Sequence, residues 1–111
     1  MNSISIIVPC YNAEEFIVQN INLLIKQINK TKIKNEIILI NDGSSDNTYY
    51  KIKKIKKKNI KIINLKKNRG KSFAVRAGLK KAKSDHIVLI DCDLPYFNKF
   101  NFLIKKLKDG Y

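Results

Sequence analysis

The chain has 111 residues, which suits one domain with a modest core, and its 44% hydrophobic content excludes a disordered protein. The formal net charge is +14, yet only two of the 23 basic residues, Arg69 and Arg76, are the arginines that nucleic-acid readers favour. No apolar run approaches the roughly 20 residues of a membrane span, and no signal peptide is visible at the N-terminus. We therefore expect one globular domain over residues 1–111, located in the cytoplasm.

The first third of the chain predicts a strand and then a helix. Four of the five residues at positions 4–8 are isoleucine or valine, and this stretch stops at Pro9, which predicts a strand there. Apolar residues then recur at three- and four-residue spacings, which predicts a helix over about 14–29. Glu14 and Glu15 would lie in its first turn, where acidic side chains suit the positive end of the helix dipole.

The middle of the chain predicts a strand, a helix and another strand. Four apolar residues at 37–40 predict a buried strand over 36–40, which enters a loop rich in turn formers and helix caps at 41–48. A helix over about 46–57 and a strand over 59–65 follow. A polar loop over 66–71 then leads into the next element.

The last third predicts a helix, a strand and a final helix. The first of these runs from 71 or 72 to 83, and its small residues Ala74, Ala77 and Gly78 indicate close packing on a sheet. The apolar run at 86–90 predicts the fourth strand, and an amphipathic pattern predicts a helix over 97–108.

This alternation of strands and helices predicts an α/β fold, with an open parallel sheet of about four strands and helices on both faces. Ligands of such sheets bind at the carboxyl ends of the strands, near the point where the strand order reverses. The polar loops after all four strands are therefore candidates for one site. The GxxxxGK[ST] and GxGxxG signatures are absent, so a Walker-type ATPase or a Rossmann dehydrogenase lacks its main signal.

Two carboxylates, Asp91 and Asp93, follow the fourth predicted strand directly. Residues two apart in an extended chain face the same side, so both side chains could bind one divalent cation. The alternative is a surface turn with two solvated acids. The other polar loops expected at the same sheet edge favour the cation site.

The lysine-rich segment and the two cysteines are interpreted without a binding or catalytic role. Lysines alternate with isoleucine over 51–58, which favours a solvated helix face over a nucleic-acid patch and leaves attraction to anionic membranes open. Cys10 and Cys92 show no CxxC spacing, so we expect reduced thiols and no zinc site. Cys92 is expected only to fill the small position between the two aspartates.

Four motifs occur in the order and at the places of the family 2 glycosyltransferases, the inverting, nucleotide-sugar-dependent enzymes of the GT-A fold. They are Val8-Pro9-Cys10-Tyr11-Asn12-Ala13-Glu14, the loop from Ile40 through Asp42-Gly43-Ser44 to Thr48, Asn68-Arg69-Gly70-Lys71 with Arg76-Ala77-Gly78, and Asp91-Cys92-Asp93. The chain resembles the N-terminal, nucleotide-sugar-binding half of these enzymes from about Ser3 to Phe102. The end of this stretch is most similar to polyprenyl-phosphate sugar transferases, such as the dolichyl-phosphate mannose and glucose synthases.

The resemblance implies a donor site built from all four loops. Its nucleotide-sugar-binding residues would be Pro9, Tyr11, Glu14, Asp42, Asn68, Gly70, Lys71, Arg76 and Asp91. Asp42 would accept a hydrogen bond from the imide N–H of the base, and Arg76 would help to neutralise the diphosphate. Asp91 and Asp93 match the DxD motif, whose carboxylates would bind Mg²⁺ or Mn²⁺ against the diphosphate of a UDP- or GDP-linked sugar.

Several of these residues have a structural alternative. Asp42 before a glycine could simply form a turn, Lys71 could be a solvated lysine in a first helical turn, and Arg76 could lie on the surface. Asp46 is expected to cap a helix, not to bind a ligand.

The family's enzymes continue well beyond the DxD motif, whereas only about 18 residues follow it here. No catalytic base can be assigned. We expect either part of a longer enzyme that transfers sugar to a lipid phosphate or a glycan, or a truncated nucleotide- and metal-binding module without transfer activity. An unpaired apolar sheet edge would favour poor solubility or homo-oligomers.

Overall fold

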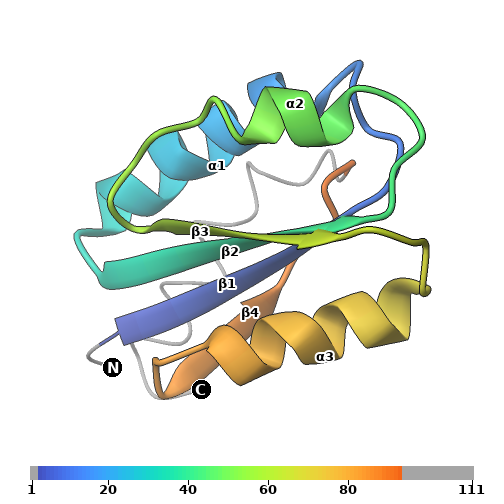
Figure 1. Cartoon of the computed structure of the whole chain (residues 1–111). Helices are drawn as coiled ribbons and strands as arrows, with labels where there is room; N and C mark the ends of the chain where they lie inside the picture. The colour runs from blue at the N-terminus through green and yellow to red at the C-terminus, as the bar shows by residue number, and fades with distance from the viewer. Residues whose placement is uncertain (1–2, 94–111) are drawn as a thin grey trace.

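The computed structural model describes residues 3–93. Its four strands form one parallel sheet in the order β3-β2-β1-β4. The strands are β1 (Ser3–Cys10), β2 (Lys34–Asp42), β3 (Ile60–Leu65) and β4 (His86–Leu89). Helices α1 (Ile17–Thr31) and α2 (Thr48–Ile52) cover one face of the sheet, and α3 (Lys71–Lys81) covers the other (Figure 1). The predicted open parallel sheet with helices on both faces is confirmed.

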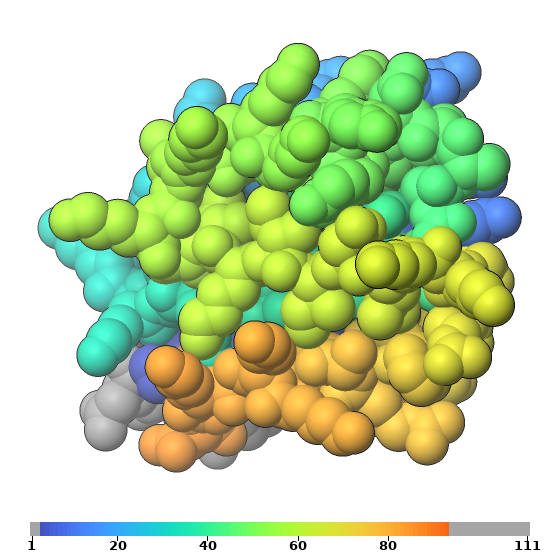
Figure 2. Space-filling model, viewed as in Figure 1, coloured from blue at the N-terminus to red at the C-terminus, as the bar shows by residue number. Residues whose placement is uncertain are grey.

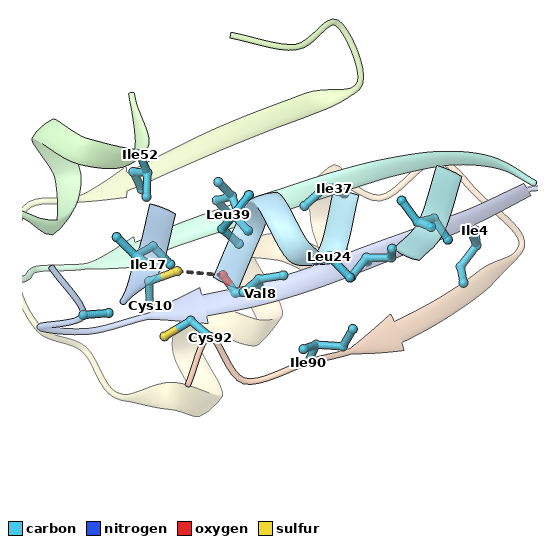
Figure 3. Close-up of a cluster of buried hydrophobic side chains, with 14 of the residues drawn as sticks. Ile4, Val8, Cys10, Ile17, Leu24, Ile37, Leu39, Ile52, Ile90 and Cys92 are labelled. Atoms are coloured by element: carbon cyan, nitrogen blue, oxygen red, sulfur yellow. Dashed lines mark hydrogen bonds between the residues drawn. The ribbon is translucent and has the colours of Figure 1, made fainter. Parts of the chain in front are cut away.

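Isoleucine-rich central strands are buried on both faces because helices cover both sides of the sheet. The larger cluster lies between the sheet and α1 and α2 (Figure 3). It includes Ile4, Ile6, Val8, Ile17, Ile21, Leu24, Ile28, Ile37, Leu39 and Ile52. On the other face, Ile7, Ile38 and Ile40 pack against Ala74 of α3. A Cβ at Gly78 would lie 2.8 Å from Cγ2 of Ile7, so this glycine lets α3 approach the sheet closely.

A buried carboxylate, Glu36, joins the amino ends of the strands. Its Oε2 accepts hydrogen bonds from the Ser5 hydroxyl (2.5 Å) and the Lys83 backbone N–H (2.6 Å), and its Oε1 lies 2.7 Å from Nζ of Lys61. The Ser84 backbone N–H donates to Ser5 Oγ at 3.1 Å. One side chain therefore links β1, β2, β3 and the segment that enters β4.

β4 is an outer strand of the described sheet. Val88 and Ile90 pack on the α1 side, while Ile87 and Leu89 are exposed. Exposed apolar side chains on an outer strand favour association, and self-association of this chain stays a prediction.

Pro9 lies within β1, although the sequence predicted that the strand would stop there. The pairing of β1 with β4 ends at Ile7 and Leu89, whereas the pairing with β2 continues through Cys10. The Ile7 carbonyl faces β4, where it accepts a hydrogen bond from Ile90 N–H. Pro9, two residues later, faces the same side beyond the end of β4, so its missing N–H removes no ladder hydrogen bond.

The helices begin or end at other residues than predicted. α1 begins at Ile17 instead of residue 14, because Phe16 has a non-helical backbone and residues 14–16 form a separate turn. Glu14 and Glu15 therefore lie outside its first turn. α1 also continues to Thr31, and α3 ends at Lys81 instead of residue 83.

α2 is much shorter than the predicted helix over 46–57, since it covers only Thr48–Ile52. Lysines crowd the following segment, and like charges one helical turn apart oppose a continuous helix. Lys53, Lys54, Lys56, Lys57 and Lys58 are all exposed. Figure 2 shows side chains of this segment, in green and yellow, projecting from the surface. The segment forms a solvated face, but mostly outside a helix.

The predicted helix over 97–108 lies outside the described residues. No helix within residues 3–93 is long and apolar enough to cross a membrane.

Candidate functional site

A pocket of about 230 Å³ lies at the carboxyl ends of the strands. Its lining residues are Pro9, Cys10, Tyr11, Asp42, Asn68, Gly70, Lys71 and Asp91. They come from the ends of β1 and β2, from the loop after β3 with the start of α3, and from the segment after β4. The chain runs from β1 outward to β2 and β3 and then returns to the other side of β1, so this is also where the strand order reverses.

Asp42 at the end of β2 holds the loop after β3. Its Oδ1 accepts a hydrogen bond from Arg69 N–H at 2.8 Å, and its Oδ2 accepts one from Gly70 N–H at 3.0 Å. The residue is 4% exposed. Both carboxylate oxygens therefore bind backbone, although each keeps a further lone pair for a ligand in the pocket.

Replacement of Asp42 by Asn should loosen this loop. An amide has one acceptor oxygen, so its NH₂ group would face a backbone N–H, and we expect a loss of about 2 kcal/mol in the free energy of unfolding. Amide exchange should accelerate at Arg69 and Gly70. The Ile90 amide, which donates to Ile7 in the sheet, serves as internal control. Unchanged exchange at Arg69 and Gly70 would contradict this role of Asp42.

Gly43 brings the same two loops together, a role that sequence analysis did not recognise. Its φ is +64°, and a Cβ there would lie 2.2 Å from the backbone N of Asn68 and the backbone C of Lys67. Only glycine fits such a close approach of two backbones. The Asp-Gly pair signalled a turn, but the loop that packs on it was not apparent from the sequence.

Lys71 and Asp91 form an ion pair in the pocket wall, with 2.6 Å between Nζ and Oδ1. Asp91 therefore already binds a cationic group in this structure. Asp93 is exposed and does not line the pocket. Within residues 3–93, no group of three or more His, Cys, Asp or Glu side chains could hold a metal ion.

The carboxylates of Asp91 and Asp93 fit Mg²⁺ or Mn²⁺ if a bound substrate supplies further oxygen ligands. These ions are usually held by one or two carboxylates together with substrate phosphates and water. Asp91 and Asp93 supply the carboxylates, so the remaining oxygen ligands would have to come from a diphosphate and from water.

Glu14 and Arg76 lie away from this pocket. Glu14 lies in the turn before α1, where its carbonyl accepts a hydrogen bond from Nζ of Lys51 at 2.8 Å. Arg76 is exposed on α3, beside Ile63 and Leu65 of β3. The other seven predicted nucleotide-sugar-binding residues line the pocket together.

The loops after β1 and β2 are joined by side-chain hydrogen bonds. Oδ1 of Asn12 accepts one from Ser45 N–H (2.9 Å), and Oγ1 of Thr48 accepts one from Ala13 N–H (2.7 Å). Asp46 Oδ1 accepts from Thr48 N–H at 2.9 Å, but the N-cap of α2 is Asn47, so Asp46 stabilises the turn before the helix and is not its cap. Although burial alone would raise the pKa of Asp46, these hydrogen bonds hold it below its ordinary value.

Cys10 and Cys92 are free thiols in the described structure. A hydrogen bond with Cys92, together with burial, raises the pKa of the Cys10 thiol well above its ordinary value. The neighbouring Cys10 thiol in turn lowers the pKa of Cys92, so Cys10 is the member of the pair that stays protonated.

A family profile and a curated relative both match this chain over most of its length. The sequence profile described as Glycosyl transferase family 2 matches residues 5–110. A poly-beta-1,6-N-acetyl-D-glucosamine synthase of Staphylococcus aureus is 39% identical over 110 residues, which covers 92% of this chain and 26% of that protein. The chain thus spans about a quarter of the length of this curated relative.

Solved structures are similar over most of the chain. Residues 1–349 of S. aureus TarS in complex with UDP are 33% identical, with a TM-score of 0.71, over 82% of this chain and 27% of the other. The mannosyltransferase PcManGT from Pyrobaculum calidifontis, in complex with GDP-Man and Mn²⁺, has a TM-score of 0.81 over 96% of this chain and 32% of the other. Its sequence identity is 22%, so it demonstrates similarity of fold alone.

Proposed function

This chain belongs to the family 2 glycosyltransferases, and we propose that it forms the donor-binding part of an inverting enzyme, which transfers a sugar from a nucleotide sugar to an acceptor. The pocket at the carboxyl ends of the strands carries this proposal. It lies at the reversal of strand order, where ligands of open α/β sheets bind, and residues from all four loops line it.

The nucleoside would lie between the loops after β1 and β2. Tyr11 is exposed beside the pocket and offers an aromatic face for the base, while Pro9 lies next to it in the pocket wall. Asp42 remains the proposed acceptor for an imide N–H, in addition to its two backbone hydrogen bonds.

The diphosphate would lie between the loop after β3 and the segment after β4. Gly70, with φ +96°, has no heavy atom within 4 Å of a Cβ position, so a ligand could approach the backbone there. Asp91 would hold the divalent cation, and Nζ of Lys71, which pairs with Asp91 here, would bind a phosphate oxygen instead. The cation, when bound, would stabilise the leaving nucleoside diphosphate.

The relatives favour a uridine nucleotide. TarS, at 33% identity, was solved with UDP, and a second TarS complex, at 29% identity, contains UDP-GlcNAc. We propose a UDP-linked sugar as the first donor to test and a GDP-linked sugar as the second. The proposed acceptor is a glycan, as the name of the S. aureus synthase suggests for that protein, or a lipid phosphate.

We propose that the chain is located in the cytoplasm, at or near the inner face of a membrane. The two free thiols suit a reducing compartment such as the cytoplasm. The exposed lysines at 53–58 would be attracted to the anionic cytoplasmic face of a membrane.

Calorimetric titration of UDP and GDP, each with Mn²⁺, tests the donor site. We expect binding of one nucleotide that disappears when EDTA removes the metal. Asp93→Ala should weaken this binding more than about tenfold, because even residues that only support metal ligands contribute tenfold or more to affinity.

Asp85→Asn is the matched control, since this exposed acid precedes the other end of the same strand, β4. It should leave nucleotide binding unchanged. Absence of nucleotide binding by the wild-type chain would refute the donor site. If the wild type binds, transfer of radiolabelled sugar to a polyprenyl phosphate or a glycan distinguishes an enzyme from a binding module.

A further inference from the structure

Two buried cysteines meet beside the pocket. Cys10 ends β1 and Cys92 follows β4, and they are 1% and 8% exposed. Both belong to the cluster on the α1 side of the sheet, where Figure 3 shows their sulfur atoms close to each other. The contact joins residues that are far apart in the sequence.

The two cysteines lie at equivalent distances beyond the paired part of β1 and β4. The last pair is Ile7 with Leu89, and each cysteine follows it by three residues. Cys92 itself belongs to the turn after β4, where Figure 3 shows it beside Cys10. Neighbouring strands lie about 4.8 Å apart, which is within the Cα separation of about 4.4–6.8 Å that a disulfide needs.

Both cysteines are also held in place, and one of them borders the pocket. The Cys92 carbonyl accepts a hydrogen bond from Nδ2 of Asn20 on α1 at 2.8 Å, and Cys10 pairs with Asn41 of β2. Cys10 is among the residues that line the pocket but is only 1% exposed, so exchange with a small disulfide requires local opening of the segment after β4.

We propose that Cys10 and Cys92 are a modification site, at which a low-molecular-weight disulfide such as oxidised glutathione converts the two thiols into an intramolecular disulfide. One cysteine sulfur attacks the small disulfide and forms a mixed disulfide, with release of one small thiol. The second cysteine sulfur then displaces the other small thiol. The protein loses two protons and two electrons, and the small disulfide gains them as two thiols.

Formation of this bond would tie the segment with Asp91 and Asp93 directly to the end of β1. Cys92 lies between the two aspartates, so the bond would limit how far their backbone can move relative to Pro9 and Tyr11. The disulfide therefore restrains the wall of the pocket on the β4 side.

Equilibration in glutathione redox buffers tests the proposal. Acid quenching, alkylation and mass spectrometry would give the fraction of protein that has lost two hydrogens, for the native chain and for the chain in concentrated urea. We expect the native fold to favour the intramolecular disulfide at least about tenfold over the unfolded chain, because the fold holds the two thiols together.

Cys10→Ser and Cys92→Ser are the controls, and each should yield only a mixed disulfide with glutathione. The proposal would be overturned if the native chain stays a dithiol where the unfolded chain oxidises, or if oxidation yields only disulfide-linked dimers. The readout uses no nucleotide, so its outcome is independent of the proposed donor site.

Discussion

Gly43→Ala is expected to lower the free energy of unfolding by about 3–5 kcal/mol, the combined cost of a strained backbone and a steric overlap. The φ of +64° disfavours any side chain, and the new Cβ would overlap the backbone of Lys67 and Asn68 at 2.2 Å. Backbone atoms cannot rotate away as a side chain does, so the loop after β3 must move off Asp42. Urea unfolding would measure the loss, and UDP titration with Mn²⁺ should show weaker binding.

Gly70→Ala is the matched control for this variant. Gly70 also has a positive φ, of +96°, but no heavy atom lies within 4 Å of its Cβ position. The free energy of unfolding of Gly70→Ala should therefore fall only by the cost of backbone strain at a positive φ, about 1–2 kcal/mol. Equal losses for the two variants would show that the contact between the loops does not matter.

Glu36→Gln is expected to lower the free energy of unfolding by about 2–3 kcal/mol at neutral pH, as for hydrogen bonds to a buried charged group. The variant loses the ion pair with Lys61 and cannot accept from Ser5 and Lys83 as a carboxylate does. This side chain links β1, β2, β3 and the segment that enters β4, so the loss should appear in global unfolding by urea.

The difference in free energy of unfolding between the wild type and Glu36→Gln should depend on pH, which provides a second measurement. Burial alone would raise the pKa of Glu36, but the hydrogen bonds from Lys61, Ser5 and Lys83 lower it below the ordinary value. A lowered pKa in the folded state means that the carboxylate stabilises the fold above the unfolded-state pKa of about 4.3. This contribution is lost as the pH falls from there through the lower folded-state pKa.

The wild type and Glu36→Gln should therefore converge in stability in acid. Glu15→Gln is the control, because Glu15 is an exposed acid before α1. It should match the wild type closely at neutral pH. A difference between the wild type and Glu36→Gln that persists unchanged below the folded-state pKa would contradict an ionised role for Glu36.

The donor site could be predicted in outline because its loops follow four recognisable strands. Parallel strands place their carboxyl ends at one edge of the sheet, so Asp42, Gly70 and Asp91 were expected together, and they line one pocket. Glu14 was expected there as part of the loop after the first strand, and Arg76 by resemblance alone. The turn before α1 and the outward side of α3 place them elsewhere.

Element boundaries were less predictable than element types. The pattern at 46–57 suggested one helix, since isoleucines and lysines alternate there at helical spacing. The chain instead leaves the helix after Ile52 and returns to start β3 at Ile60. The charge repulsion and the return to the sheet depend on three-dimensional context that a local pattern does not contain.

The α/β alternation and the polar loops were predictable from the residues, because periodicity and turn chemistry are local properties of the chain. Contacts between residues of different loops became visible only in the folded chain. They are Lys71 with Asp91, Gly43 with the backbone of Lys67 and Asn68, Cys10 with Cys92, and Glu36 with three other segments. These contacts depend on strand register and on the face to which each helix packs. Both are set by interactions between residues distant in sequence, so no local pattern could reveal them.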